Sequence, residues 1–216
     1  MRKFKIDLEN YVRKDHFLYF CRLENPYVGL TADVDVSSLV KACKEKKQSF
    51  YLAFMHAAAL AADMIPEFRR RITGQEIWEY EECPTSHTEP LDNGTYCYCT
   101  LHHHMPLRDY FQKAEEQRAA VKSKGTLEED EEVDGMYFIT CVPWLHYSAL
   151  VQPLGRDSNP RISWGKYEED FRGRQMMPVT VLLHHGLADG LHIAGFYEEL
   201  NGQIGKISEE LKDWDY

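Results

Sequence analysis

The sequence lacks the features that mark several large classes of protein. No apolar run is long enough to span a membrane, and the segment Met1–Asp7 carries basic residues without the apolar stretch of a secretory signal. We therefore expect a cytoplasmic protein. Basic residues are also scarce, with 25 Lys and Arg against 35 Asp and Glu and a net charge of −10. This balance argues against nucleic acid or an anionic membrane as the main partner.

Cysteine motifs and repeats are missing as well. None of the six cysteines belongs to a Cys-x-x-Cys pair, and Cys97 and Cys99 have no second pair that would complete a zinc site. In a reducing compartment we expect free thiols in the core. No internal repeat occurs, in particular no hexapeptide repeat of a left-handed β-helix. What remains is a chain of 216 residues with 44% hydrophobic residues, which fits one domain over residues 1–216.

The chain alternates between helix and strand patterns. Residues 49–64 are apolar on nearly all sides and rich in alanine, which predicts a helix packed inside the domain, and Pro106 opens an amphipathic helix. The acidic run Glu128–Glu132 predicts a solvated loop. Strands are predicted at a hairpin over 69–80 and at 95–101, 136–142, 147–151, 161–167 and 178–185. The predicted fold class is α/β, a two-layer sandwich of a mixed sheet with helices packed on it.

The most reactive stretch follows the last predicted strand. The apolar run 179–183 predicts a buried strand, and His184, His185, Gly186, Asp189 and Gly190 then lead into a helix. A histidine held at the end of a rigid strand suits a general base, since imidazole titrates near neutrality. The alternative is a histidine that only packs in the core.

Metal binding is the other alternative for this stretch, because His184, His185, Asp189 and His192 are all of ligand type. Neighbouring histidines point to opposite faces of a strand, however, so His184 and His185 cannot easily bind one ion. Three consecutive histidines in a strand or a loop are not expected to converge, so we expect His102–His104 to form a polar edge. No metal is therefore expected.

The motif His184-His185-Gly-Leu-Ala-Asp189-Gly190 resembles the His-His-x-x-x-Asp-Gly signature of the chloramphenicol acetyltransferase family, one of the coenzyme A-dependent acyltransferases. Further segments resemble the family in order and spacing over nearly the whole chain: Asn10–Phe17, Ser49–Phe54, Pro66–Arg69, Thr140–Trp144 and Ile162–Tyr167. The resemblance implies a chloramphenicol acetyltransferase-like fold. It also implies an enzyme that inactivates the antibiotic by transferring acetyl from acetyl-CoA to a hydroxyl of chloramphenicol.

The resemblance implies roles for the residues around this motif. His185 would be the general base, acting directly on the acceptor without an acyl-enzyme, while His184 faces away into packing. Thr140 stands where the family has a serine that donates to the oxyanion, and it keeps the hydroxyl. Asp189 would orient the turn through an ion pair with Arg13, worth about 3 to 5 kcal/mol if buried.

Substrate positions are implied in the same way. Ser163 would lie near the tetrahedral centre, and Lys166 and Tyr167 near coenzyme A, where Lys166 could meet a phosphate. Tyr19, Phe20, Tyr96 and Tyr98 would line the acceptor pocket, and Tyr98 stands where a small residue is usual, which predicts a smaller or reshaped pocket.

The family works as a homotrimer with active sites between subunits, so the same assembly is implied here, with a small-molecule acceptor and coenzyme A as partners. Two alternatives stay open: the same acyl transfer to a different small alcohol or amine, and a non-catalytic trimer that binds a small molecule.

Overall fold

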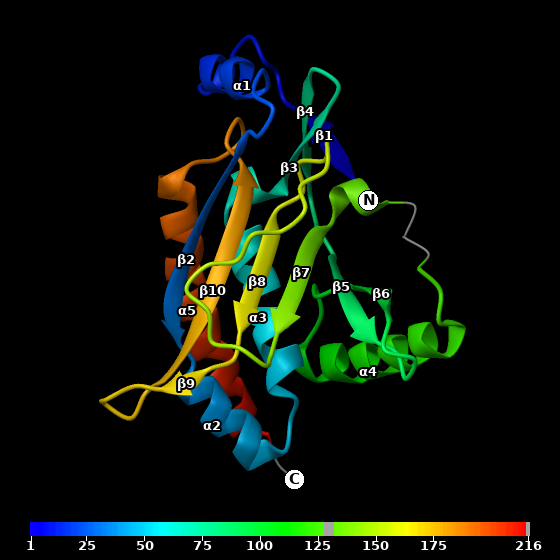
Figure 1. Cartoon of the computed structure of the whole chain (residues 1–216), viewed down its shortest axis with the longest axis vertical. Helices are drawn as coiled ribbons and strands as arrows, with labels where there is room; N and C mark the ends of the chain where they lie inside the picture. Colours follow the sequence, from blue (N-terminus) through cyan, green and yellow to red (C-terminus); the bar gives the residue numbers. More distant parts are fainter. Residues whose placement is uncertain (128–131, 215–216) are drawn as a thin grey trace.

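A mixed β-sheet forms the centre of the molecule. The computed structural model describes residues 1–127 and 132–214 (Figure 1). The sheet has seven strands, six of them in the order β2-β10-β8-β7-β5-β6, with β9 beside β10. Their bounds are β2 Tyr27–Asp35, β5 Thr85–Pro90, β6 Tyr96–Leu101, β7 Tyr137–Val142, β8 Arg161–Gly165, β9 Glu168–Glu169 and β10 Gln175–His184. The pairs β5–β7 and β7–β8 are parallel and the other pairs are antiparallel. The predicted mixed sheet is thus confirmed.

Helices cover one face of this sheet. The helices α3 (Phe50–Asp63) and α5 (Gly190–Lys212) lie behind it in Figure 1, α2 (Ser37–Lys46) lies below β9 beside α5, and α4 (Leu107–Lys124) lies beneath β5 and β6. Alternate residues of the central strands point toward the helices, so that Val179, Val181 and Leu183 are buried with Ile162 and the alanines of α3. The two layers confirm the predicted α/β sandwich.

The opposite face of the sheet carries a row of hydroxyl groups. The register places Thr140 beside Ser163, Ser163 beside Thr180, and Thr180 beside Thr31, across four neighbouring strands. Each of the four is out of phase with the residues that face the helices. The segment that joins β7 to β8 crosses this face, where Gln152 Nε2 donates to Ser163 Oγ at 2.8 Å.

A smaller sheet lies beside the N-terminal helix. It contains β1 (Lys3–Lys5), β4 (Glu76–Tyr80) and β3 (Arg70–Thr73), so the predicted hairpin over 69–80 is confirmed. Helix α1 (Lys14–Phe20) follows β1, and two short 3-10 helices, η1 (Pro66–Arg69) and η2 (Val133–Gly135), complete the described elements. Within the described ranges, no helix combines the length and the apolar character that crossing a membrane requires.

One prediction of secondary structure and one of cysteine burial were wrong. Residues 147–151 do not form a strand but belong to the irregular segment between β7 and β8, and both edges of β8 are paired, with β7 and with β10. The six cysteines are free, as predicted, but Cys21 is exposed and is no core thiol. The predicted acidic loop lies, except for Glu132, outside the described residues.

Gly165 sits where the crossing segment comes closest to the sheet. A Cβ atom there would lie 2.5 Å from the carbonyl oxygen of Leu145 and 2.9 Å from Cγ of Pro178. The obstructing carbonyl is backbone, so it cannot rotate away as a side chain would.

We therefore expect Gly165→Ala to lower the free energy of unfolding by about 1 to 3 kcal/mol, because an extra methyl group in a filled space forces the backbone to shift. Urea denaturation measures the change. Gly202→Ala in α5 is the control, since nothing lies within 4 Å of its added Cβ, and it should stabilise by about 0.5 to 1 kcal/mol. Equal effects of the two substitutions would contradict this account.

Candidate active site

His185 is fixed immediately after the central strand β10. Its backbone N–H donates to the carbonyl of Pro26 at 2.7 Å, which continues the contact between β10 and the chain before β2. Its ring stacks on Phe20 of α1, with centroids 4.0 Å apart, and Tyr19 meets Phe20 edge-on. Of the four predicted acceptor residues, Phe20 therefore contacts the predicted base, and Tyr19 contacts Phe20.

The second contact of this imidazole decides its chemistry. His185 Nδ1 lies 3.0 Å from the carbonyl oxygen of Ala188, which can only accept a hydrogen bond. The proton therefore belongs on Nδ1, and the lone pair on Nε2 is left to accept another proton. This is the tautomer that a general base needs.

His184 points into the protein, as the sequence predicted. It is buried, its Nδ1 accepts from the N–H of Gly186 at 3.2 Å, and its ring packs on Tyr27. Burial, with the nearby His185, lowers the pKa of His184 to about 4. His184 is therefore neutral at pH 7 and has a packing role.

Asp189 begins helix α5 and joins it to the N-terminal segment. Its carboxylate accepts from the backbone N–H of Leu191, lies 2.8 Å from His192 Nδ1 and accepts from Arg13 at 2.5 Å. Burial opposes ionisation of Asp189, but hydrogen bonds from Arg13 and His192 outweigh it and lower the pKa of Asp189 to about 2. Arg13 also reaches the carbonyl oxygen of His185 at 3.5 Å, so the predicted ion pair forms beside the base.

The remaining predicted residues lie elsewhere in the chain. The register pairs Thr140 of β7 with Ser163 of β8, and Ser163 with Thr180 of β10, so Thr140 and Thr180 are two strands apart at the same height in the sheet. Thr180 comes five residues before His185 in the sequence. At about 3.3 Å per residue and about 4.8 Å per strand, Thr140 lies roughly 19 Å from His185. One copy of the chain therefore does not bring the base and the predicted oxyanion donor together.

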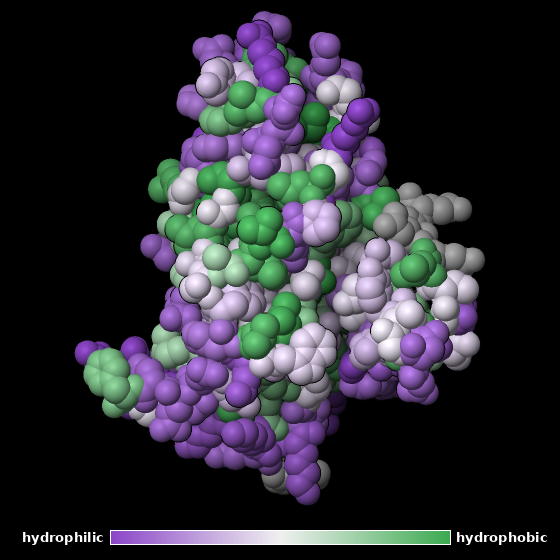
Figure 2. All heavy atoms as spheres, in the orientation of Figure 1, coloured by the Kyte–Doolittle hydropathy of each residue, from purple (hydrophilic) through white to green (hydrophobic). Residues whose placement is uncertain are grey.

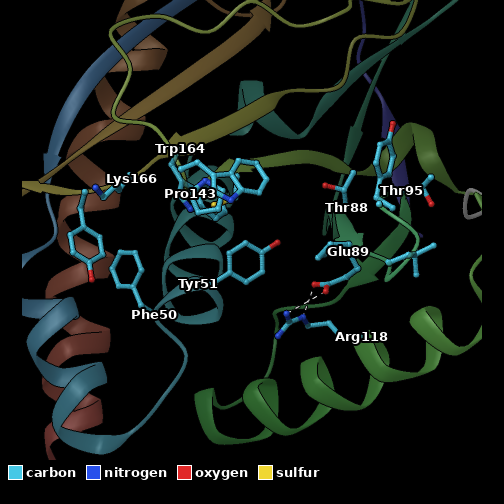
Figure 3. A pocket seen from close by; sticks show the side chains of 17 residues that line it. Phe50, Tyr51, Thr88, Glu89, Thr95, Arg118, Pro143, Trp164 and Lys166 are labelled. Atoms are coloured by element: carbon cyan, nitrogen blue, oxygen red, sulfur yellow. Dashed lines mark hydrogen bonds and ion pairs between the residues drawn. The ribbon is translucent and has the colours of Figure 1, made fainter.

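A cavity of about 810 Å³ opens at the far end of β7 and β8. Figure 3 shows Phe50 and Tyr51 of α3 facing Trp164, Pro143 and Lys166 across it, and Thr88 and Thr95 at its other side. Three of the predicted substrate residues line this cavity, namely Lys166, Tyr167 and Tyr96. Tyr98 lies next to Tyr96, with ring centroids 5.9 Å apart.

Sequence analysis missed a buried charged group in the wall of the cavity. Glu89 accepts from Arg118 at 2.5 Å and lies 2.9 Å from Lys122 Nζ, and Figure 3 shows Glu89 and Arg118 facing each other. Burial would raise the pKa of Glu89, but bonds from His87, Arg118 and Lys122 lower it to about 2. No local sequence signal marks this group, because Arg118 is 29 residues from Glu89 on another element.

Comparison with solved structures gives the class of the protein. The chain matches a chloramphenicol acetyltransferase with a TM-score of 0.84 and 27% identity, covering 94% of this chain and 100% of that one. It also matches the cubic core of the pyruvate dehydrogenase multienzyme complex with a TM-score of 0.67, at 15% identity, covering 89% of this chain and 86% of that one, which shows a shared fold. The match to the acetyltransferase over nearly the whole chain gives the class of the protein as an acyltransferase.

The family follows from the sequence comparisons. The model of the family described as chloramphenicol acetyltransferase matches residues 1–201. Chloramphenicol acetyltransferases of Bacillus pumilus and Escherichia coli are 27% and 24% identical over 213 and 201 residues, covering 95% and 90% of both chains in each pair. The chain belongs to the chloramphenicol acetyltransferase family.

Loss of the ion pair provides a test of its structural role. We expect Arg13→Gln to lower the free energy of unfolding at pH 7 by about 1 to 3 kcal/mol, less than for a fully buried pair, because solvent screens the exposed part of the pair. The folded-state pKa of Asp189, about 2, lies below its usual 3.8, so this contribution is complete above pH 3.8 and is lost as the pH falls through about 2.

Urea denaturation at pH 7 and at pH 3 measures this difference. Lys14→Gln is the control, since it breaks the exposed Lys14–Glu9 pair next in the chain and should cost under about 1 kcal/mol. A difference between wild type and Arg13→Gln that is as large at pH 3 as at pH 7 would contradict the assignment to Asp189.

Proposed function

We propose that the chain transfers the acetyl group of acetyl-CoA to a hydroxyl of chloramphenicol, in a homotrimer whose active sites form between neighbouring copies. The observation that carries the proposal is the contact of His185 Nδ1 with the carbonyl of Ala188, which leaves Nε2 free as a base. The family membership supplies the reaction class, and the relatives that match over most of the chain are named as chloramphenicol acetyltransferases.

In this reaction His185 Nε2 removes the proton of the acceptor hydroxyl as its oxygen attacks the thioester carbonyl carbon. The developing oxyanion accepts a hydrogen bond from the hydroxyl of Thr140, and Ser163 lies beside Thr140 on the next strand. The C–S bond then breaks, and the departing thiolate takes the proton from His185. No acyl-enzyme forms, so both substrates are bound at the same time.

The thioester substrate has a fitting place in the cavity of about 810 Å³. Its wall offers aromatic surface from Phe50 and Tyr167 and the half-exposed side chain of Lys166, whose ammonium group lies 3.8 Å from Oε1 of the exposed Glu168. An ammonium group suits a phosphate oxygen, and flat aromatic rings suit a nucleobase. Lys166 and Tyr167 are therefore assigned to coenzyme A.

Assembly from several copies follows from the separation of the two catalytic groups. His185 and Thr140 of one chain are roughly 19 Å apart, too far to act on one substrate. The crossing segment also exposes Trp144, Leu145 and Val151, and Figure 2 shows apolar residues gathered across the middle of this face. Large exposed apolar surfaces mark contacts between proteins. His185 of one copy is thus proposed to face Thr140 of the next.

The acceptor pocket combines Tyr19 and Phe20 beside His185 with Tyr96 and Tyr98 of the neighbouring copy. The ring of Tyr98 occupies space next to Tyr96 and favours a smaller or differently shaped acceptor than the family's usual one. A different small alcohol is therefore the second candidate acceptor, with the same chemistry.

The reaction itself is tested by thiol release from acetyl-CoA with and without chloramphenicol. We expect chloramphenicol-dependent release that falls about 10²- to 10⁴-fold in His185→Ala, because the base is lost. His102→Ala, which removes an exposed histidine outside the site, should keep full activity. Release that is unaffected by His185→Ala would sink the assignment of the base, and binding of acetyl-CoA without release would favour another acceptor.

The site between copies is tested by mixing two inactive variants. Thr140→Ala and His185→Ala should each be nearly inactive, yet refolding them together at equal amounts should restore about a quarter of the wild-type activity. In a closed ring assembled at random from equal amounts of the two variants, one site in four combines an intact His185 from one copy with an intact Thr140 from the next copy. Mixing without refolding is the control. Tags of different size on the two variants show whether mixed assemblies have formed. If they have formed and no activity is recovered, each active site lies within one chain.

A further inference from the structure

Three side chains converge on one point on the helix side of the sheet, away from the proposed active site. Asp63 is the last residue of α3, and His103 and His104 belong to the irregular segment between β6 and α4. The Nε2 atoms of His103 and His104 lie 2.6 Å and 2.7 Å from the same carboxylate oxygen, Oδ2 of Asp63. Within residues 1–127 and 132–214, they are the only three His, Cys, Asp or Glu side chains whose ligand atoms all lie within 4.8 Å of one another.

This convergence corrects the expectation that three consecutive histidines form a polar edge. That expectation was that successive side chains point apart in a strand or a loop, as they do in a strand. Strand β6 ends at Leu101, however, and beyond it the backbone turns so that the rings of His103 and His104 lie side by side, 4.5 Å apart. His103 is buried, whereas His102 and His104 are exposed.

The carboxylate at the centre is held in place from its other side. The hydroxyl of Tyr137 donates to Oδ1 of Asp63 at 2.7 Å, and Arg69 Nε donates to the backbone carbonyl of Asp63 at 3.1 Å. These contacts hold the Asp63 carboxylate so that its other oxygen, Oδ2, points toward His103 and His104. Carboxylates and imidazoles held by such outer hydrogen bonds are typical of metal ligands.

We propose that Asp63, His103 and His104 bind one divalent transition-metal ion of the Zn²⁺ class. Two imidazole nitrogens and one carboxylate oxygen form a donor set that Zn²⁺ prefers, at about 2.0 to 2.2 Å from each atom. Tetrahedral bonds of that length need ligand atoms about 3.3 Å apart, so each contact has to widen by roughly 0.6 Å. The side chain of His104 is 37% exposed, which gives it room to rotate and lets water occupy the fourth position.

The ion would connect elements that are distant in the chain. Asp63 and His103 are 40 residues apart, and the bond would join the end of α3 to the start of α4. These ligands contact neither His185 nor Thr140 in the described interactions, so the proposed ion is structural and takes no part in acyl transfer.

The test uses the full chain with any affinity tag removed, stripped with a chelator and then dialysed against Zn²⁺. Elemental analysis should find about one zinc per chain, and the melting temperature should rise on adding Zn²⁺, because an ion that binds only the folded state stabilises it. Co²⁺ in place of Zn²⁺ should give the visible absorption of a tetrahedral site.

Asp63→Asn and His104→Ala should both lose the zinc and the rise in melting temperature, while His102→Ala, from the same histidine run, should keep both. His104 is partly exposed, so His104→Ala remains informative if Asp63→Asn is poorly folded, as judged by circular dichroism. Less than about 0.1 zinc per wild-type chain, or equal zinc in the His104→Ala and His102→Ala proteins, would overturn the proposal and leave a hydrogen-bonded cluster.

Discussion

The ion pair between Arg13 and Asp189 holds together the part of the molecule around His185, the proposed base. It joins residues 176 positions apart, at the two ends of the chain. Through it, α1 is kept against the turn after β10, so that Phe20 stacks on His185. Asp189 also begins α5, the longest helix, whose apolar side packs on the sheet. One carboxylate therefore aligns the N-terminal segment, the base and the closing helix at once, although it does not contact the ring of the base.

Sequence patterns predicted most of the fold because its elements are locally regular. The alanine-rich helix, the hairpin turning at Gly74 and the last strand each follow from periodicity and turn residues within a dozen positions. Residues 147–151 look like a strand for the same local reasons, yet they belong to the irregular segment that crosses the sheet between β7 and β8. Pairing with a neighbouring strand is a property of the whole sheet, which no short segment of sequence contains.

The residues of the candidate site also fall into those that local sequence predicts and those that only the whole fold brings together. The strand-end histidine and its turn could be predicted, and resemblance placed Arg13 opposite Asp189. The row formed by Thr31, Thr180, Ser163 and Thr140 could not be predicted, because only the register of four strands brings these hydroxyls side by side. The same holds for Glu89 with Arg118, and for Asp63 with His103 and His104, where long-range packing brings ordinary polar residues together.

The partner of His185 Nδ1 is a backbone carbonyl, and this choice affects how the enzyme can change over evolutionary time. A side-chain carboxylate that accepted from Nδ1 could be lost by a single nucleotide substitution in the gene. The backbone carbonyl of residue 188 would remain whatever amino acid stood there. A backbone carbonyl also does not ionise, so it accepts the hydrogen bond from Nδ1 of His185 at every pH at which the protein is folded. The residues around His185 can therefore vary without loss of the tautomer that the proposed general base requires.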